Sequence, residues 1–188
     1  MVFLKVLKFL TSTSLFLALN SSLVVAFGYL LYDIAFSPVM LLIGFLATFS
    51  VYGLNKATDK NEDNINRPET AQRSTTFYLI PSIAALIISI ILSALESIFA
   101  LIIVLTPLLV GVVYSVKFSL SIPRLKEIVG VKSLTVAFSW ALTGALLPAT
   151  IESVVIEKII LVFSYIFTQL FVNTVLFDAL DVKGDSFS

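Results

Sequence analysis

Apolar residues dominate the chain in six long runs that are separated by short polar stretches. The runs cover residues 11–32, 36–54, 77–95, 98–116, 134–149 and 159–177. Most approach the roughly 20 residues that a helix needs to cross a bilayer. Because their apolar character lacks the alternation of a transmembrane barrel, the pattern predicts α-helices. We therefore expect an all-α, polytopic transmembrane helical bundle with about six spanning helices.

The basic residues between these runs are distributed unevenly. All but Lys158 fall before the first run, between the second and third, between the fourth and fifth, or after the sixth: Lys5, Lys8, Lys56, Lys60, Arg67, Arg73, Lys117, Arg124, Lys126, Lys132 and Lys183. If six helices cross, these residues share one side, which the positive-inside rule assigns to the cytoplasm. The sequence thus predicts an integral cell membrane protein with both termini cytoplasmic.

The first run, preceded by two lysines, also has features of a signal peptide. No small-x-small cleavage site is evident, and the run is nearer to a full span than to the short apolar core of a signal. We expect it to be a retained first helix. Residues 1–188 are then predicted to form a single membrane domain in the lipid bilayer.

Composition narrows the possible chemistry. Mean hydropathy is +1.05 and 13% of the residues are charged, against about 25% in soluble domains. The formal net charge is zero, so nucleic-acid binding loses its main electrostatic basis. Cysteine and histidine are absent, which excludes thiolate nucleophiles, a Ser-His-Asp triad and imidazole ligands. The remaining oxygen ligands suit Mg²⁺ or Ca²⁺.

A first Asp-rich loop, residues 55–76, follows the second run. Asn55, Asp59, Asp63 and Arg67 recur every four residues, so they share one face if the helix continues. Like charges at this spacing repel by a few tenths of a kcal/mol. A divalent cation would turn that repulsion into binding energy. A solvated loop, in which acids and bases cancel, is the alternative.

A calcium-binding loop is a weaker interpretation of the same segment. Asp59, Asn61 and Asp63 occupy its first, third and fifth ligand positions. Asn64 stands where that loop needs glycine, and Thr70 where it needs a bidentate glutamate. The match therefore fails at two decisive positions.

A second Asp-rich segment, residues 178–188, follows the sixth run. Asp178, Asp181 and Asp185 are spaced i, i+3, i+7, again on one helical face. Gln169 and Asn173 continue the polarity into the run, where amides are expected to face the bundle interior. An even number of crossings predicts that both Asp clusters lie at the cytoplasmic face. A polar C-terminal tail remains the alternative.

At these residues the sequence resembles the UbiA superfamily of intramembrane prenyltransferases. Asn55, Asp59, Asp63, Arg67 and Pro68 match the first motif of that family, with Lys56 in place of its first aspartate. Asp178, Asp181 and Asp185 match the second motif in full. A basic cytoplasmic loop, residues 117–133, is also similar, and its candidate residues are Lys117, Arg124 and Lys126. The resemblance covers nearly the whole chain.

This resemblance implies Mg²⁺-dependent transfer of an isoprenyl group from a polyprenyl diphosphate to an aromatic or lipid acceptor, a step of isoprenoid biosynthesis. It implies that Asp59, Asp63, Asp178 and Asp181 are catalytic residues and that they hold Mg²⁺ together with Asp185. Asn55, Arg67, Lys117, Arg124 and Lys126 are the implied diphosphate-binding residues.

The chain departs from the family in length, because family members usually have nine spanning helices. We expect a fragment, a truncated reading frame, or one half of a split protein in which a separate chain supplies the missing helices, with weak or no activity alone. An inactive lipid-binding homologue is one alternative. The other is a divalent-cation or small-solute transporter, for which ionisable residues near mid-membrane would be expected.

Overall fold

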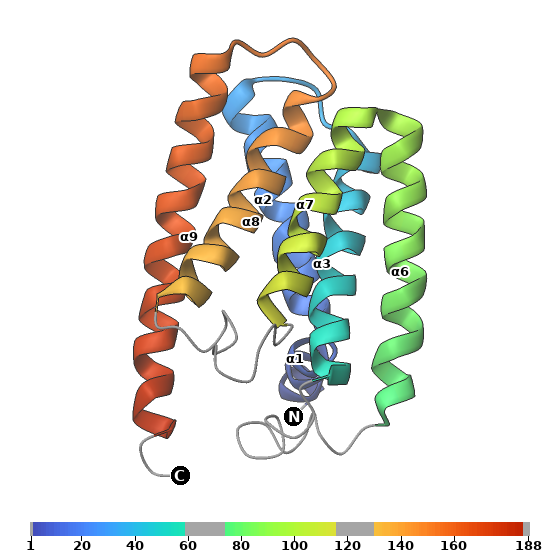
Figure 1. The fold of residues 1–188 in the computed structure, drawn as a ribbon, viewed down its shortest axis with the longest axis vertical. Coiled ribbons are helices and arrows are strands. Elements are labelled where there is room, and N and C mark those ends of the chain that lie inside the picture. The colour runs from blue at the N-terminus through green and yellow to red at the C-terminus, as the bar shows by residue number, and fades with distance from the viewer. Residues whose placement is uncertain (1, 59–73, 116–129, 186–188) are drawn as a thin grey trace. The chain divides into compact units, whose positions relative to one another are not determined.

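The computed structural model describes residues 2–58, 74–115 and 130–185. For residues 2, 7, 8, 111–115 and 177–185 it gives the course of the backbone alone. The regular elements within these ranges are all α-helices, which confirms the predicted fold class (Figure 1). In chain order they are α1 (Val2–Ser12), α2 (Leu15–Tyr32), α3 (Pro38–Thr58), α6 (Thr75–Glu96), α7 (Ile98–Ser115), α8 (Val131–Ala149) and α9 (Ile156–Asp185).

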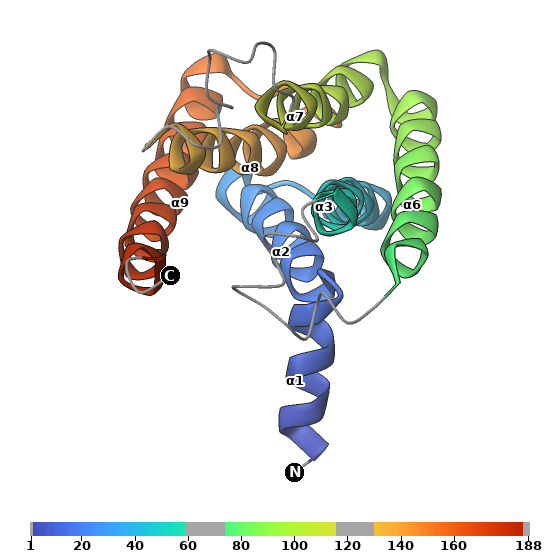
Figure 2. The same ribbon diagram turned by 60° about the horizontal axis from the view of Figure 1, so that its bottom comes forward.

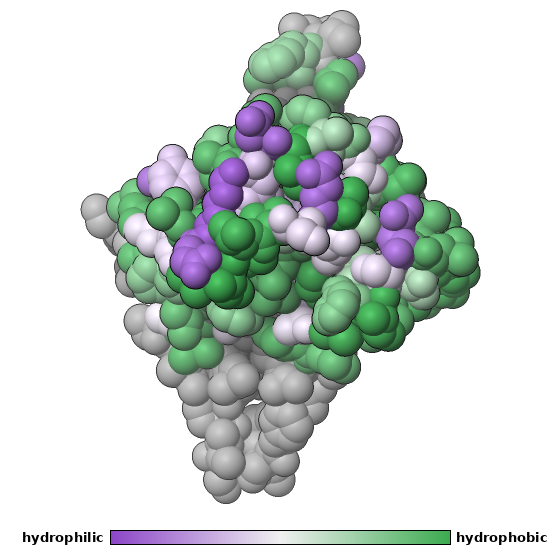
Figure 3. All heavy atoms as spheres, turned by 90° about the horizontal axis from the view of Figure 1, so that it is seen from above, coloured by the Kyte–Doolittle hydropathy of each residue, from purple (hydrophilic) through white to green (hydrophobic). Residues whose placement is uncertain are grey.

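Five of these helices are long and apolar enough to cross a membrane: α2, α3, α6, α8 and the Ile156–Leu176 part of α9. Helix α7 corresponds to the fourth predicted run, residues 98–116, although its apolar described part, Ile98–Val110, is shorter. Large apolar side chains such as Leu23, Leu95 and Leu161 are exposed, and Figure 3 shows hydrophobic residues over much of the face it displays. The chain is an integral, multi-pass membrane protein.

The beginning of the chain differs from the prediction of one continuous helix over residues 11–32. A turn at Thr13 and Ser14 separates α1 from α2, and Ser14 has a left-handed backbone with φ of 67°. Hydropathy carries no sign of this turn, because apolar residues continue on both sides of it. Figure 2 shows α1 projecting from the beginning of α2.

The described residues form two compact units. Unit 1 comprises Met1–Leu23 and Ser37–Val104, and unit 2 comprises Val24–Phe36 and Leu105–Ser188.

In unit 1, helix α3 packs against α6 through small residues. The buried face of α3 contains Gly44, Ala47, Ser50 and Gly53, and the buried face of α6 contains four small residues, Ser82, Ala85, Ser89 and Ser93. Small side chains let helix backbones approach closely, as is typical of membrane helices. The buried serine hydroxyls donate to carbonyls of their own helices, so close packing leaves these polar groups satisfied.

Two hydroxyls join α2 to α3 within unit 1. Ser21 Oγ donates to the Gly44 carbonyl at 3.1 Å, and Ser22 Oγ donates to the Leu41 carbonyl at 2.8 Å. Hydrogen bonds of this kind between membrane helices contribute about 0.6 kcal/mol on average. They fix the register of two helices whose apolar surfaces alone would specify it weakly.

In unit 2, helix α2 crosses α8 at a pair of glycines. A Cβ added to Gly28 would overlap the carbonyl oxygen of Gly144 and lie 3.0 Å from Pro148 Cγ. Pro148 lacks an N–H, so it cannot donate to Gly144, the residue four positions before it. Gly28 therefore covers a carbonyl that has lost its usual partner within the helix.

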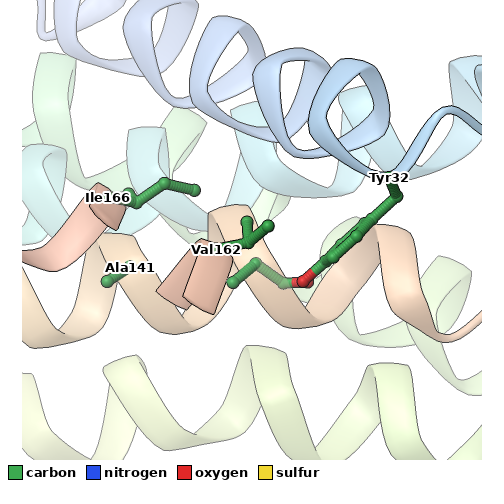
Figure 4. Packing of buried hydrophobic residues seen from close by; sticks show 5 residues of the cluster. Tyr32, Ala141, Val162 and Ile166 are labelled. Atoms are coloured by element: carbon green, nitrogen blue, oxygen red, sulfur yellow. The ribbon is translucent and has the colours of Figure 1, made fainter. Parts of the chain in front are cut away.

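The core of unit 2 lies where α8 packs against α9. Tyr32, Ala141, Val162 and Ile166 form it together with Ala145, and all are at most 3% exposed (Figure 4). Along α9, Phe163, Phe167 and Phe171 stack with ring centroids 6.1 and 5.7 Å apart. Val162 and Ile166 are the fully buried residues in the described side chains of α9, and many of its other side chains are exposed.

Polar contacts close the end of α2 in unit 2. Tyr32 Oη donates to the Ala145 carbonyl at 2.9 Å, and Lys158 Nζ donates to the Tyr32 carbonyl at 2.7 Å. Asp33 follows with a positive φ of 58°, and the Ile34 N–H donates to the Tyr29 carbonyl at 3.3 Å. This is the Schellman arrangement of a helix C-terminus, completed by a cation at its negative end.

Candidate functional site

The first predicted motif begins in the last turn of α3. Asn55 is half-buried there, which confirms that this helix continues beyond its apolar run as far as Thr58. Asp59, Asp63 and Arg67 lie outside the described residues. Lys117, Arg124 and Lys126 of the basic loop also lie outside them, so the contacts predicted for these side chains stay predictions.

The second motif lies on α9, which is helical without interruption through Asp185. Asp178, Asp181 and Asp185 therefore keep the helical spacing that puts them on one face. Only the backbone is described at these positions. The meeting of the two motifs, predicted from the number of crossings, stays a prediction.

The expectation that the amides of α9 face the interior is wrong for the described structure. Gln169 and Asn173 are both exposed. The helical period puts both amides on the same stripe as Val162 and Ile166, but packing along this stripe ends at Ile166, and beyond it Gln169 and Asn173 are left uncovered. An amide in a spanning helix is costly to leave in lipid.

Lys56, which stands where the UbiA family has an aspartate, contacts the end of α1. Its ammonium donates to the carbonyl oxygens of Thr11 at 2.8 Å and Ser12 at 3.0 Å. The last carbonyls of a helix lack partners within the helix and carry its negative dipole end. Lys56 thus caps α1, a role that its place in the motif does not indicate.

An apolar pocket lies in unit 1 beside this capped end. Its volume is about 220 Å³, and the turn after α1, the last turns of α3 and the first turns of α6 surround it. The large apolar side chains that line it are Phe9, Leu15, Phe49, Phe77 and Pro81. Gly53, which also lines it, lies two residues before Asn55. The pocket therefore adjoins the beginning of the first motif.

Two hydroxyls in the pocket lining, those of Ser82 and Thr13, already donate to backbone carbonyls. Ser82 Oγ donates to the Tyr78 carbonyl at 2.7 Å, and Thr13 Oγ1 donates to the Phe9 carbonyl at 2.7 Å. The surface offered to a ligand is therefore mainly aromatic and aliphatic. Sites for whole drug-sized ligands measure about 300–1,000 Å³. This smaller pocket suits one segment of a hydrocarbon chain.

Sequence reasoning missed the pocket, because its phenylalanines were indistinguishable from lipid-facing ones. The pocket follows from Gly53 and Ser82, whose small size brings α3 and α6 together while Phe49 and Phe77 stand to the side. The one signal in the sequence was that Phe49 and Phe77 lie near helix ends, close along the chain to the first motif.

Among the residues whose side chains the structure describes, no group of three Asp or Glu residues is placed to hold a metal ion. The predicted ligands belong to the parts of the chain given as backbone or not described. Carboxylates on one helical face are nevertheless the donor set that Mg²⁺ prefers.

No family model, curated protein or solved structure matches the chain.

Proposed function

We propose that the chain is a UbiA-like prenyltransferase or a part of one. It would transfer an isoprenyl group from a polyprenyl diphosphate to an aromatic or lipid acceptor. The observation that carries the proposal is the unbroken course of α9 through Asp185, which keeps three aspartates on one face immediately beyond a spanning segment. This spacing matches the second motif of the family at every aspartate.

The pocket in unit 1 supports the same proposal. A polyprenyl diphosphate has a highly charged head and a long apolar tail, so its site must combine both environments. The pocket supplies an apolar environment two residues from Asn55, where the first motif begins. We propose that part of the isoprenyl tail occupies this pocket while the diphosphate binds at the cytoplasmic boundary.

Carboxylates of the two motifs would hold Mg²⁺, and the bound metal would neutralise charge on the departing diphosphate. Asn55 would donate its amide hydrogens to a diphosphate oxygen, and Arg67, Lys117, Arg124 and Lys126 would supply further cationic donors. Lys56 contributes no carboxylate, and its contact with α1 gives it a structural task. The first motif would therefore hold a metal with one carboxylate fewer than the first motif of the UbiA family contains.

The exposed amides of α9 favour a further helical partner. Gln169 and Asn173 lie one turn apart on the spanning helix, and amides in membrane spans normally find partners on other helices. We propose that a separate chain or segment supplies helices at this side of α9. Without it, we expect substrate binding with little turnover.

Binding of farnesyl diphosphate to the full chain in lipid nanodiscs tests the proposal. We expect Mg²⁺-dependent binding that Asp181→Asn weakens strongly. Asp33→Asn is the matched control, since Asp33 is exposed in the connection between α2 and α3, outside both motifs, and asparagine tolerates its positive φ. Equal binding by the Asp181 variant would contradict the proposal. Mg²⁺ flux into vesicles without any diphosphate would favour a transporter.

A further inference from the structure

Helix α1 is too short to cross a membrane. Its 11 residues extend about 16 Å at a rise of about 1.5 Å per residue, whereas the hydrocarbon core is about 30 Å thick. The described structure nevertheless leaves large apolar side chains of α1 exposed, with Phe3 at 76%, Leu4 at 67% and Val6 at 50%. This short helix needs an apolar environment that its own unit does not provide.

The contact with Lys56 fixes where α1 ends. Helix α3 has 21 residues, or about 32 Å, so it crosses the hydrocarbon core once and its last turn reaches the boundary. Lys56 lies in that last turn and holds the carbonyls of Thr11 and Ser12. The contact therefore holds the C-terminal end of α1 at the boundary that the last turn of α3 reaches.

The sequence of α1 is amphipathic. Phe3, Val6 and Leu10 follow the i, i+3, i+7 spacing of one face, and Lys5 and Ser12 lie on the other. Beyond the turn, Phe16 and Leu19 of α2 are exposed as well, so apolar surface continues from α1 into a lipid-facing span. A short helix with a cationic polar face and an aromatic apolar face is typical of one that lies in the membrane interface.

We propose that α1 lies along the membrane surface, with Phe3 and Val6 in the acyl-chain boundary and Lys5 among anionic headgroups. The occupant of its apolar face is the lipid of the leaflet at which α3 ends. Lys56 holds the helix in this orientation. Because Phe9 of α1 also lines the pocket of unit 1, the same helix forms the wall between that pocket and the leaflet.

The absence of cysteine allows a direct test with single nitroxide labels. Full chains carrying Phe3→Cys, Lys5→Cys or Val6→Cys are labelled and reconstituted in vesicles of phosphatidylcholine and phosphatidylglycerol. Collision rates with oxygen, which concentrates in lipid, are compared with those of a water-soluble nickel complex. Leu23→Cys, in the exposed surface of α2, is the reference for a deep position.

We expect the labels at residues 3 and 6 to collide more with oxygen, though less than the label at residue 23, and the label at residue 5 to collide more with nickel. Equal nickel access at residues 3, 5 and 6 would overturn the proposal, because α1 would then lie in water. Protection of residues 3 and 6 from both reagents would also overturn it, because protein would then cover that face.

A second set of variants tests whether the contact of Lys56 with Thr11 and Ser12 orients α1. In the Val6→Cys background, Lys56→Met removes the donor to Thr11 and Ser12, and we expect loss of the oxygen preference at residue 6. Lys56→Arg keeps a cationic donor, so the preference is expected to remain. An unchanged preference in the Lys56→Met chain would show that Lys56 does not orient α1.

Discussion

The ammonium nitrogen of Lys56 lies 2.8 Å from the carbonyl oxygen of Thr11. This contact joins residues 45 positions apart in the chain and holds the end of α1 against the end of α3. It also assigns a structural role to the residue that interrupts the acidic motif.

Loss of this contact is expected to destabilise unit 1. Lys56→Met removes two charge-assisted hydrogen bonds to a helix C-terminus, which contribute about 1 kcal/mol at a half-buried position. For a chain of this size that corresponds to a fall in Tm of roughly 2–4 °C, measured by thermal unfolding in detergent. Lys56→Arg is the matched control and should unfold near the parent temperature. A Tm for Lys56→Met equal to that of the parent would contradict the capping role.

Gly53→Ala is expected to strain the α3–α6 contact. A Cβ at this position would overlap Ser82 Oγ, and such overpacking costs about 1–3 kcal/mol. Ser82→Ala removes the overlapping hydroxyl but keeps Ser82 Cβ, which would lie 3.1 Å from the new Cβ, so the double variant should recover part of the lost stability. A double-mutant cycle of thermal or denaturant unfolding measures this coupling. Additive losses would mean that the two residues do not meet.

Gly28→Ala serves as the control for the double-mutant cycle of Gly53 and Ser82, because its clash is with backbone. Its Cβ would overlap a backbone oxygen, that of Gly144, which no side-chain truncation can remove. We therefore expect a larger loss of stability than for Gly53→Ala, without recovery by Ser82→Ala.

Ser14→Gly is expected to raise stability. Ser14 is fully buried, its φ is 67°, and its Oγ has no partner among the described residues. Glycine removes both the left-handed strain of about 1 kcal/mol and the unpaired hydroxyl, which costs about 1–3 kcal/mol. Its greater chain entropy offsets about 0.5–1 kcal/mol of this gain. A β-branched residue should have the opposite effect, so Ser14→Val is the comparison in the same unfolding assay.

Removal of Mg²⁺ is expected to abolish stabilisation by inorganic pyrophosphate. A ligand present at 100 times its Kd stabilises a folded protein by about 2.7 kcal/mol, so Mg²⁺ with pyrophosphate should raise Tm by several degrees. Chelation with EDTA should reverse the shift, and Asp178→Asn should reduce it. Glu152→Gln alters an exposed acid outside both motifs and serves as the control. A full shift in the Asp178 variant would count against metal binding by α9.

The helices themselves could be predicted closely from hydropathy. The run at residues 77–95 became α6, Thr75–Glu96, and the run at 134–149 became α8, Val131–Ala149. A long apolar segment in lipid must satisfy its backbone internally, so its ends follow where polar residues begin. The break after α1 could not be predicted, because it depends on one backbone torsion at Ser14.

The candidate site was predictable only in part. The spacing of Asp178, Asp181 and Asp185 predicted a helical segment, and α9 is helical through all three, whereas their role as metal ligands stays a prediction. The capping role of Lys56 and the pocket beside Phe49 could not be derived this way, since both depend on how α1, α3 and α6 pack. The burial of Gln169 was predicted wrongly, because the packed stripe of Val162 and Ile166 ends before it reaches this residue.

The cap that Lys158 places on Tyr32 has a consequence for biosynthesis. The two residues are 126 positions apart, so α2 enters the membrane long before its cap has been translated. Until α9 follows, water or lipid headgroups must solvate the Tyr32 carbonyl. The order of synthesis therefore makes the α8–α9 hairpin the step that completes unit 2, and a ribosome stalled before residue 158 would leave the Tyr32 carbonyl without its ammonium donor.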